Sequence, residues 1–125
     1  MVPALGPDGA VWFTRGDGRI GRVDPSGTAS SVPVPTPTGW PYGLCAGPDS
    51  ALWYTLLSAD RIGRLTLDGT IDEFPLTGGG MPSMITAGPD GALWFTLNRG
   101  GFNWSSQHQL VEPRRVARRV LRQGS

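Results

Sequence analysis

The chain has 125 residues, of which 38% are hydrophobic and 17% charged, and its formal net charge is +1. This length allows one small domain, and no apolar run reaches the roughly 18 residues that a membrane-spanning helix needs. The N-terminal segment has neither the basic start nor the apolar run of a signal peptide. Because the chain also has a single cysteine, Cys45, we expect a cytoplasmic protein that does not bind membranes.

One nine-residue phrase occurs three times along the chain at a constant step of 41 residues. Its copies are GPDGAVWFT at 6–14, GPDSALWYT at 47–55 and GPDGALWFT at 88–96. A second phrase, RIGRV at 19–23, returns as RIGRL at 61–65. Ordered phrases that recur at one period are the signature of a repeat protein.

The repeat from about residue 41 to residue 81 predicts four short strands. A Gly-Pro-Asp turn separates the first two, since proline favours the second position of a tight turn. The second strand is apolar on both faces, which indicates that both faces are covered. Asp68-Gly69 is a strong hairpin signal between the last two. The predicted strands are Leu44–Ala46, Ala51–Leu56, Arg61–Leu67 and Thr70–Phe74.

Four short strands in about 41 residues are typical of a β-propeller blade. Blades stack face to face, so we expect the Trp of each repeat to lie between neighbouring sheets. The chain is therefore predicted to be all-β, with a partial β-propeller over residues 1–100. This part would hold a partial first blade, a complete second blade of four antiparallel strands and the first half of a third, about two and a half blades in total.

The C-terminal segment 101–125 departs from the repeat and is rich in arginine. It holds five Arg against one acidic residue, whereas residues 1–100 hold six Arg against nine acidic residues. We expect an irregular or helical tail, with Val116, Val120 and Leu121 on one helical face. Three interpretations remain: a C-terminus produced by a frame change or truncation, a solvated helix, or a contact with nucleic acid or an anionic membrane. We expect no nucleic-acid partner, because the propeller part is acidic.

The blade phrases resemble the virginiamycin B lyase family. The resemblance implies a seven-bladed propeller that opens cyclic streptogramin B antibiotics. The implied reaction is a magnesium-dependent elimination that breaks a carbon–oxygen bond, so the family is a class of lyases linked to antibiotic resistance. The phrases that carry the resemblance are PYGL at 41–44, GPD at 47–49, LWYT at 52–55, ADRIGRL at 59–65, DGTIDEFPL at 68–76, MPS at 81–83 and WFT at 94–96.

The catalytic positions of the family are not matched in this chain. In late blades of the family a His follows the blade-opening Pro, and a Glu lies close by. Here Tyr42 and Ser83 occupy the position after that Pro. The position after the Trp-Phe-Thr phrase, where family blades commonly have Glu, holds Arg15, Leu56 or Leu97. The sequence thus identifies no catalytic residue and no metal ligand, and the isolated chain is expected to be inactive.

Two functions compete for this sequence. The first is a truncated virginiamycin B lyase-like protein, whose intact form would use Mg²⁺ and take a cyclic lactone antibiotic as its partner. The second is a non-catalytic propeller module that binds a ligand or a protein, with the ring completed by a homo-oligomer. In both, Tyr42 and Ser83 are the candidate ligand-binding residues, because the propeller places them at the top of the central channel.

The other chemically notable residues are expected to be structural. His108, the one histidine, lies in the tail, where we expect a solvated surface residue. Cys45 is expected to be a small buried residue of an inner strand. Equivalent aspartates are expected to hydrogen-bond within their turns, and two arginines of the second blade to pair within or between blades. These residues are Asp8, Asp49 and Asp90, and Arg61 and Arg64.

Overall fold

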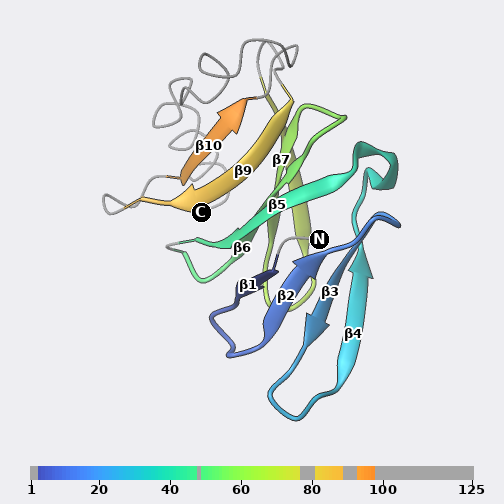
Figure 1. Cartoon of the computed structure of the whole chain (residues 1–125), viewed down its shortest axis with the longest axis vertical. Helices are drawn as coiled ribbons and strands as arrows, with labels where there is room; N and C mark the ends of the chain where they lie inside the picture. The colour runs from blue at the N-terminus through green and yellow to red at the C-terminus, as the bar shows by residue number, and fades with distance from the viewer. Residues whose placement is uncertain (1–2, 48, 77–80, 89–92, 98–125) are drawn as a thin grey trace.

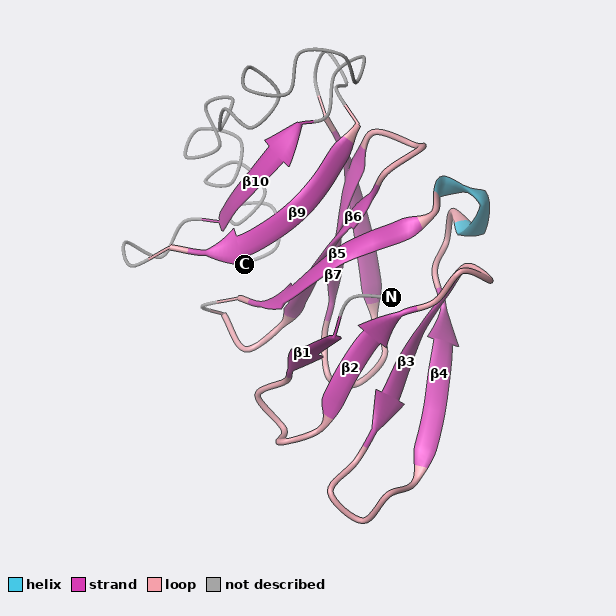
Figure 2. Cartoon of the chain, viewed as in Figure 1, coloured by secondary structure: helices cyan, strands magenta, loops and turns pink. Residues whose placement is uncertain are grey.

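The computed structural model describes residues 3–47, 49–76, 81–88 and 93–97 (Figures 1 and 2). Within these ranges the chain forms ten β-strands, one short 3-10 helix and connecting turns. The strands make three antiparallel sheets in chain order, two of four strands and one of two strands. This confirms the predicted all-β fold with propeller-type blades. No helix in the described ranges is long and apolar enough to cross a membrane.

The first sheet is a complete blade, which corrects the prediction of a partial one. Each strand pairs with the next in an antiparallel ladder. The first strand has only three residues, yet they suffice to pair with the second strand. The hydrogen bond from the Gly9 amide to the Gly6 carbonyl (3.1 Å) closes the turn between them. The strands are β1 (Pro3–Leu5), β2 (Val11–Thr14), β3 (Arg19–Val23) and β4 (Ala29–Pro33).

The second sheet confirms the four strands predicted from the repeat. The short helix η1 (Pro37–Gly39) leads into it from the first blade. The hairpin at Asp68-Gly69 is closed by a hydrogen bond from the Thr66 amide to the Thr70 carbonyl (2.9 Å), and Gly69 has a φ of 92°. The strands are β5 (Pro41–Ala46), β6 (Leu52–Leu56), β7 (Arg61–Leu65) and β8 (Ile71–Pro75).

The third sheet consists of β9 (Pro82–Ala87) and β10 (Leu93–Leu97) in the described ranges. These two strands correspond to the predicted first half of a third blade. The predicted tail at 101–125, including His108, lies outside the described residues, as does Asp90. The division into a propeller part and a tail therefore stays a prediction.

The hydrophobic core lies between the sheets. One cluster joins Trp12 of the first blade to the apolar face of the second blade, including Leu52 and Leu65. A second cluster joins Trp53 of the second blade to Leu93 and neighbouring residues of the third. Trp12 and Trp53 are both buried, so the prediction that each Trp lies between neighbouring sheets is confirmed for these two. Aromatic side chains of this size contribute much of the buried apolar area of a core.

Trp12 and Trp53 are each held by an aspartate and an arginine of their own blade. Asp49 accepts hydrogen bonds from Trp53 Nε1 (3.0 Å) and from Arg64 Nε (2.8 Å), and the Arg64 guanidinium lies 5.9 Å from the indole centre. Asp8 accepts the equivalent bonds in the first blade. The aspartates also cap their own turns, as predicted. They therefore do more than stabilise a turn, because they fix the Trp that forms the interface with the next blade.

A glycine in the third strand of the first and second blades makes room for an aromatic ring. Gly63 pairs directly with Tyr54 across the sheet, and a Cβ added at Gly63 would overlap the Tyr54 ring. Gly21 and Phe13 repeat this arrangement in the first blade. The glycine of the Arg-Ile-Gly-Arg phrase is therefore required by the aromatic residue of the neighbouring strand.

Candidate functional site

The first strands of the second and third blades, β5 and β9, run side by side (Figure 1). They approach closely because Gly43 has no side chain: a Cβ at this position would overlap the carbonyl oxygen of Ser83. Tyr42 and Ser83 occupy equivalent positions on these two strands, directly after the prolines that open them. The structure thus brings the two candidate ligand-binding residues onto adjacent strands, in agreement with the blade alignment of the sequence.

Buried threonine hydroxyls fix the backbone at both candidate residues. Thr55 Oγ1 donates to the Ser83 carbonyl (2.7 Å) and accepts from the Gly43 amide (2.9 Å), so it links two blades through one atom. Thr14 Oγ1 donates to the Tyr42 carbonyl (2.9 Å) in the same way. A hydroxyl can donate and accept at once, which is the property that this position requires. The backbone at Tyr42 and Ser83 is therefore held in place before any ligand binds.

The side chains of the two residues differ in how much freedom they keep. Ser83 Oγ is 2.8 Å from Thr96 Oγ1 and shares a hydrogen bond with it. Tyr42 is half-buried. A phenol and a hydroxyl can hydrogen-bond a polar ligand, and the Tyr ring adds an apolar face. This is the chemistry of a binding position rather than of a strong base.

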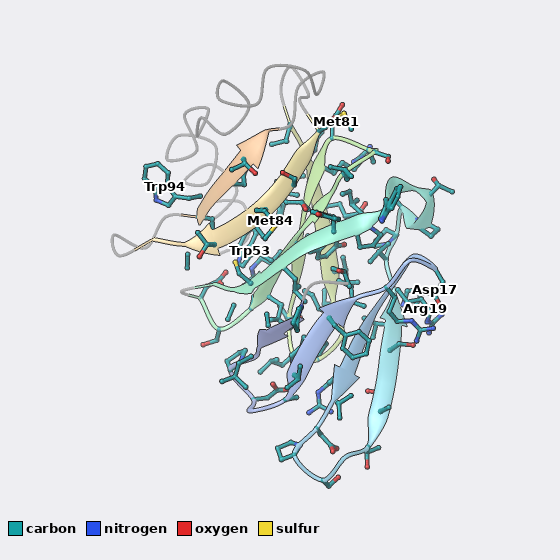
Figure 3. The ribbon with its side chains drawn as sticks, viewed as in Figure 1. Asp17, Arg19, Trp53, Met81, Met84 and Trp94 are labelled. Atoms are coloured by element: carbon teal, nitrogen blue, oxygen red, sulfur yellow. The ribbon has the colours of Figure 1, made fainter. Side chains whose placement is uncertain are left out.

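Two exposed apolar residues next to these positions were not identified from the sequence. Trp40 and Met81 each precede the opening Pro of a blade, and both have positive φ angles, 63° and 55°. The Trp40 carbonyl accepts from the Leu57 amide (3.1 Å), and the Met81 amide donates to Asp60 Oδ1 (2.8 Å). Their side chains remain exposed to solvent (Met81 in Figure 3). The signal in the sequence was a large apolar residue before each blade-opening Pro.

The residues in the described ranges do not fit a magnesium site. No cluster of three or more His, Cys, Asp or Glu side chains occurs among them. Mg²⁺ in proteins is typically bound through carboxylates, whereas Tyr42 and Ser83 offer only neutral oxygens. Leu56, at a position where the family commonly has Glu, is fully buried in the core cluster. Arg15, at the equivalent position of the first blade, forms an exposed ion pair with Asp17.

Cys45 has the surroundings of a structural residue rather than those of an activated nucleophile. Burial and the nearby charge of Asp49 raise the pKa of its thiol to about 12. The thiolate, which is the reactive form, is therefore almost absent near neutral pH. This agrees with the prediction of a buried structural residue, although Cys45 is half-buried rather than fully enclosed.

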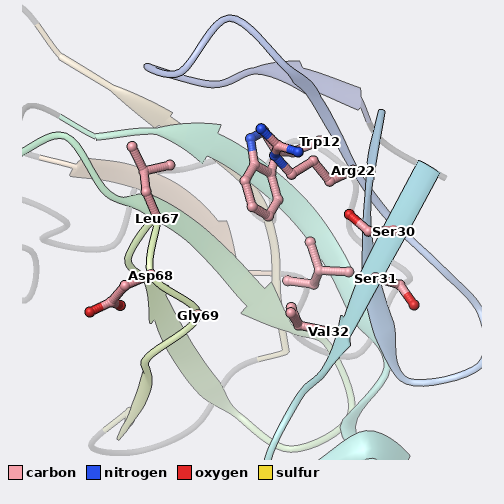
Figure 4. A pocket seen from close by; sticks show the side chains of 9 residues that line it. Trp12, Arg22, Ser30, Ser31, Val32, Leu67, Asp68 and Gly69 are labelled. Atoms are coloured by element: carbon pink, nitrogen blue, oxygen red, sulfur yellow. The ribbon is translucent and has the colours of Figure 1, made fainter. Parts of the chain in front are cut away.

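A hollow of about 260 Å³ lies between β4 of the first blade and the β7–β8 turn of the second (Figure 4). Its polar groups already serve the fold: Arg22 binds Asp8, and Arg19 donates to Ser31 Oγ (2.8 Å). Small-molecule sites usually have volumes of roughly 300–1,000 Å³. The hollow is therefore a gap between blades and a weaker candidate for a binding site than the positions of Tyr42 and Ser83.

The fold and these inter-blade contacts define part of a β-propeller, with two four-stranded blades and a third sheet of two described strands. The chain matches the model of the virginiamycin B lyase family over residues 1–102 and belongs to that family. It is 43% identical to the virginiamycin B lyase of Nocardia farcinica over 72 residues, which are 57% of this chain and 24% of that protein.

Solved structures show the same relationship. A catalytically inactive histidine-to-alanine variant of the virginiamycin B lyase from Staphylococcus aureus, crystallised with quinupristin, aligns with a TM-score of 0.72 and 41% identity over 76% of this chain and 33% of that one. A streptogramin B lyase aligns with a TM-score of 0.74 and 43% identity over 78% of this chain and 34% of that one. The chain therefore spans about a third or less of the length of these relatives.

Proposed function

We propose that this chain supplies blades of a virginiamycin B lyase-type propeller that binds a cyclic peptide lactone at the end of the channel where Tyr42 and Ser83 lie. Family membership supports this proposal, and so does the Staphylococcus aureus relative that was crystallised with quinupristin. In intact members of the family the lactone is opened by magnesium-dependent elimination. The blades described here contribute to binding and to the shape of the channel.

The observation that carries the proposal is the identity of the residues after the blade-opening prolines. An elimination needs a general base that removes a proton while the carbon–oxygen bond breaks. Tyr42 and Ser83 stand where a catalytic blade has His, and their hydroxyl groups lack the basic ring nitrogen that an imidazole offers. The described part of the chain therefore offers no histidine base at these positions and no cluster of carboxylates that would hold Mg²⁺.

Mass spectrometry tests the catalytic part of the proposal. The purified chain is incubated with Mg²⁺ and quinupristin, and the products are compared with those of an intact lyase. We expect the lactone to remain cyclic with the chain alone. Appearance of the linear product at a rate above the protein-free background would contradict the proposal.

Calorimetric titration tests the binding part. Tyr42→Ala is expected to weaken quinupristin binding by about tenfold, since an aromatic contact is worth roughly 1 kcal/mol or more. Leu67→Ala is the matched control, because Leu67 is an exposed apolar residue on the β7–β8 turn, away from β5 and β9. Equal affinities of the Tyr42 variant and wild type would rule out Tyr42 as a contact residue.

The second candidate function is a non-catalytic binding module completed by oligomerisation. It is favoured by one observation, the exposed apolar face of the first blade, where Val11 and Leu5 face solvent. A lyase and a binding module differ in a measurable way. Both bind a ligand at the channel, but only the lyase converts it once the missing catalytic blades are present.

A further inference from the structure

The segment that leads from the first blade into the second ends in a tryptophan with a left-handed backbone. The short helix η1, drawn in cyan in Figure 2, connects β4 to β5, and Trp40 follows it directly. Trp40 has a φ of 63° and a ψ of 83°. A bulky residue seldom adopts this conformation, because its Cβ crowds the following carbonyl oxygen. The conformation costs free energy, so contacts elsewhere must hold Trp40 in it.

Turns of two blades fix the helix that precedes Trp40. A Cβ added at Gly18, in the β2–β3 turn of the first blade, would lie 2.6 Å from Pro37 Cβ. A Cβ added at Gly39 would lie 2.8 Å from the Cβ of Ala59, in the β6–β7 turn of the second blade. The Gly39 carbonyl also accepts a hydrogen bond from the Ser58 amide (2.9 Å). The helix η1 is therefore packed closely against both blades.

The backbone from Trp40 to Tyr42 is anchored at both ends. The Trp40 carbonyl accepts a hydrogen bond from the Leu57 amide of the second blade (3.1 Å). The Tyr42 carbonyl accepts one from Thr14 Oγ1 of the first blade (2.9 Å). Only the buried Pro41 lies between the two anchored residues. Trp40 and Tyr42 are thus fixed in position relative to each other by the fold.

The indole of Trp40 contributes little to this anchoring. Trp40 is 55% exposed, whereas Trp12 and Trp53 are 4% and 0% exposed. In the described ranges it belongs to neither of the two buried clusters. Glycine or asparagine would adopt the left-handed conformation at a lower cost. The chain instead holds a large aromatic ring in solvent on a fixed backbone, and strained residues of this kind are concentrated at ligand sites.

The exposure of Trp40 belongs to the connection between two blades. Both of these blades are described with all four strands, and blades stack through the faces of their sheets. A blade added before the first or after the third would therefore stack on other surfaces. A molecule that covers the ring has to approach from the end of the sheets at which Tyr42 also lies.

We propose that Trp40 is a ligand-binding residue. Its indole, next to Tyr42, takes an apolar or aromatic side chain of the cyclic peptide lactone. This inference rests on the proposed function and names the part of the ligand that is recognised here. Two aromatic rings prefer offset or edge-to-face contacts, which the exposed indole can offer. Because the backbone is already fixed, the contact loses little conformational entropy.

Calorimetric titration of the 125-residue chain with quinupristin tests the contact. Trp40→Asn removes the ring but suits the left-handed backbone, and it should weaken binding by about tenfold. Trp40→Phe keeps an aromatic face and should bind within about threefold of wild type. Ser50→Asn is the matched control, since Ser50 is exposed, has the same φ of 63° and lies in the β5–β6 turn at the other end of β5. It should not change the affinity.

Urea unfolding separates a binding role from a structural one. In Trp40→Asn the relieved backbone strain offsets the partial packing that is lost, so its midpoint should lie within roughly 0.3 M of the wild-type value. A larger fall of the midpoint together with weaker binding would overturn the proposal, because Trp40 would then act through the fold. Equally weak binding by Trp40→Phe and Trp40→Asn would overturn it as well, since the aromatic face would not be what the ligand contacts.

The same titrations distinguish this contact from the proposed function. If wild type binds quinupristin and Trp40→Asn binds it equally well, the contact at Trp40 is wrong and the proposed function stands. If wild type does not bind quinupristin, the proposed function is overturned and the contact with it. Weaker binding by Trp40→Asn alone, with unchanged stability, supports both.

Discussion

The first and second blades have nearly the same phrases but different neighbours. All five residues of β6 are buried, because a sheet covers each face of the second blade. In β2, which has the equivalent sequence, buried and more exposed residues alternate, since only one face is covered. The comparison shows that the burial of a propeller strand is determined by the blades beside it as much as by its own residues.

The two blades also differ in one coupled pair of residues. In the second blade Tyr54 donates to Glu73 Oε2 (3.0 Å), and Thr36, which precedes η1, donates to Glu73 Oε1 (2.6 Å). In the first blade the equivalent positions hold Phe13 and Ser31. The hydroxyl and its carboxylate acceptor are therefore absent together. Burial, with the negative charge of Glu73, raises the pKa of Tyr54 far above its usual value, so the phenol stays a donor.

The largest difference in stability loss between the blades is expected at Leu52 of the second blade and the equivalent Val11 of the first. Leu52→Ala should lower the free energy of unfolding by about 2–5 kcal/mol, because it leaves a cavity in a sealed core. Val11→Ala at the equivalent exposed position should cost less than about 1 kcal/mol in the monomer. Urea unfolding followed by circular dichroism measures both. Similar losses at the two positions would show that the first blade is covered in solution.

A smaller but clear difference is expected at the two glycines. Gly63→Ala should cost about 2–3 kcal/mol, since the added Cβ overlaps the Tyr54 ring, which is buried and anchored to Glu73. Gly21→Ala should cost about 1 kcal/mol, because the Phe13 ring is only half-buried and can move. Thermal unfolding of both variants tests this order. A larger loss at Gly21 than at Gly63 would contradict it.

The aspartates that hold the Trp residues predict a pH effect. Burial by itself raises the pKa of Asp49, but the hydrogen bonds from Trp53 and Arg64 and the Arg64 charge outweigh it, so the pKa lies below the ordinary value of 3.8. The stabilisation is therefore complete above pH 4 or so, and is lost as the pH falls through the lowered pKa. Asp49→Asn should cost about 1–2 kcal/mol at neutral pH.

The variant and wild-type stabilities should converge in acid, where the wild-type carboxylate is protonated as well. Unfolding midpoints measured from neutral pH down to about pH 3 test this, and Asp8→Asn gives the same comparison in the first blade. Burial by itself raises the pKa of Asp8 as well, but the hydrogen bonds from Trp12, the Ala10 amide and Arg22 together outweigh it, so this pKa is also lowered. A constant difference at all pH values would mean that the charge of Asp49 is not what stabilises the blade.

The smallest expected effect concerns the coupled pair. Tyr54→Phe should cost about 1 kcal/mol, because Glu73 loses a donor in a partly buried setting. The double variant Tyr54→Phe/Glu73→Ser reproduces the pair of the first blade and should cost less than the sum of the single variants. A double-mutant cycle measures this coupling. Strict additivity would show that the hydrogen bond contributes nothing to stability.

Much of the fold could be predicted from the sequence because the same nine-residue phrase occurs three times at one period. The four strands of the second blade and the placement of Trp12 and Trp53 follow from the 41-residue period and the two-faced apolar strand. The first blade was predicted to be partial because Pro3–Leu5 is too short to show a pattern. This strand forms because the neighbouring β2 offers a ladder to complete.

The candidate site was only partly predictable. The alignment of blades placed Tyr42 and Ser83 at equivalent positions, since the prolines before them mark the register. The hydrogen bonds from Thr14 and Thr55 to the following blade could not be inferred from the sequence. Each joins a hydroxyl to a carbonyl 28 residues away, and such pairing depends on how the blades stack. The left-handed conformations of Trp40 and Met81 were equally hidden, since non-glycine residues seldom adopt them.

The hydrogen bonds from Thr14 and Thr55 to the following blade bear on how such repeat proteins gain or lose blades in evolution. In the first and second blades a threonine of the second strand, Thr14 or Thr55, donates its hydroxyl to a carbonyl on the first strand of the blade that follows. A gene that duplicates or loses one whole 41-residue unit thus preserves these hydrogen bonds between blades without a compensating mutation. Unequal recombination in multiples of this unit keeps the hydrogen bonds between blades, whereas an insertion or deletion of any other length separates the hydroxyl from its carbonyl.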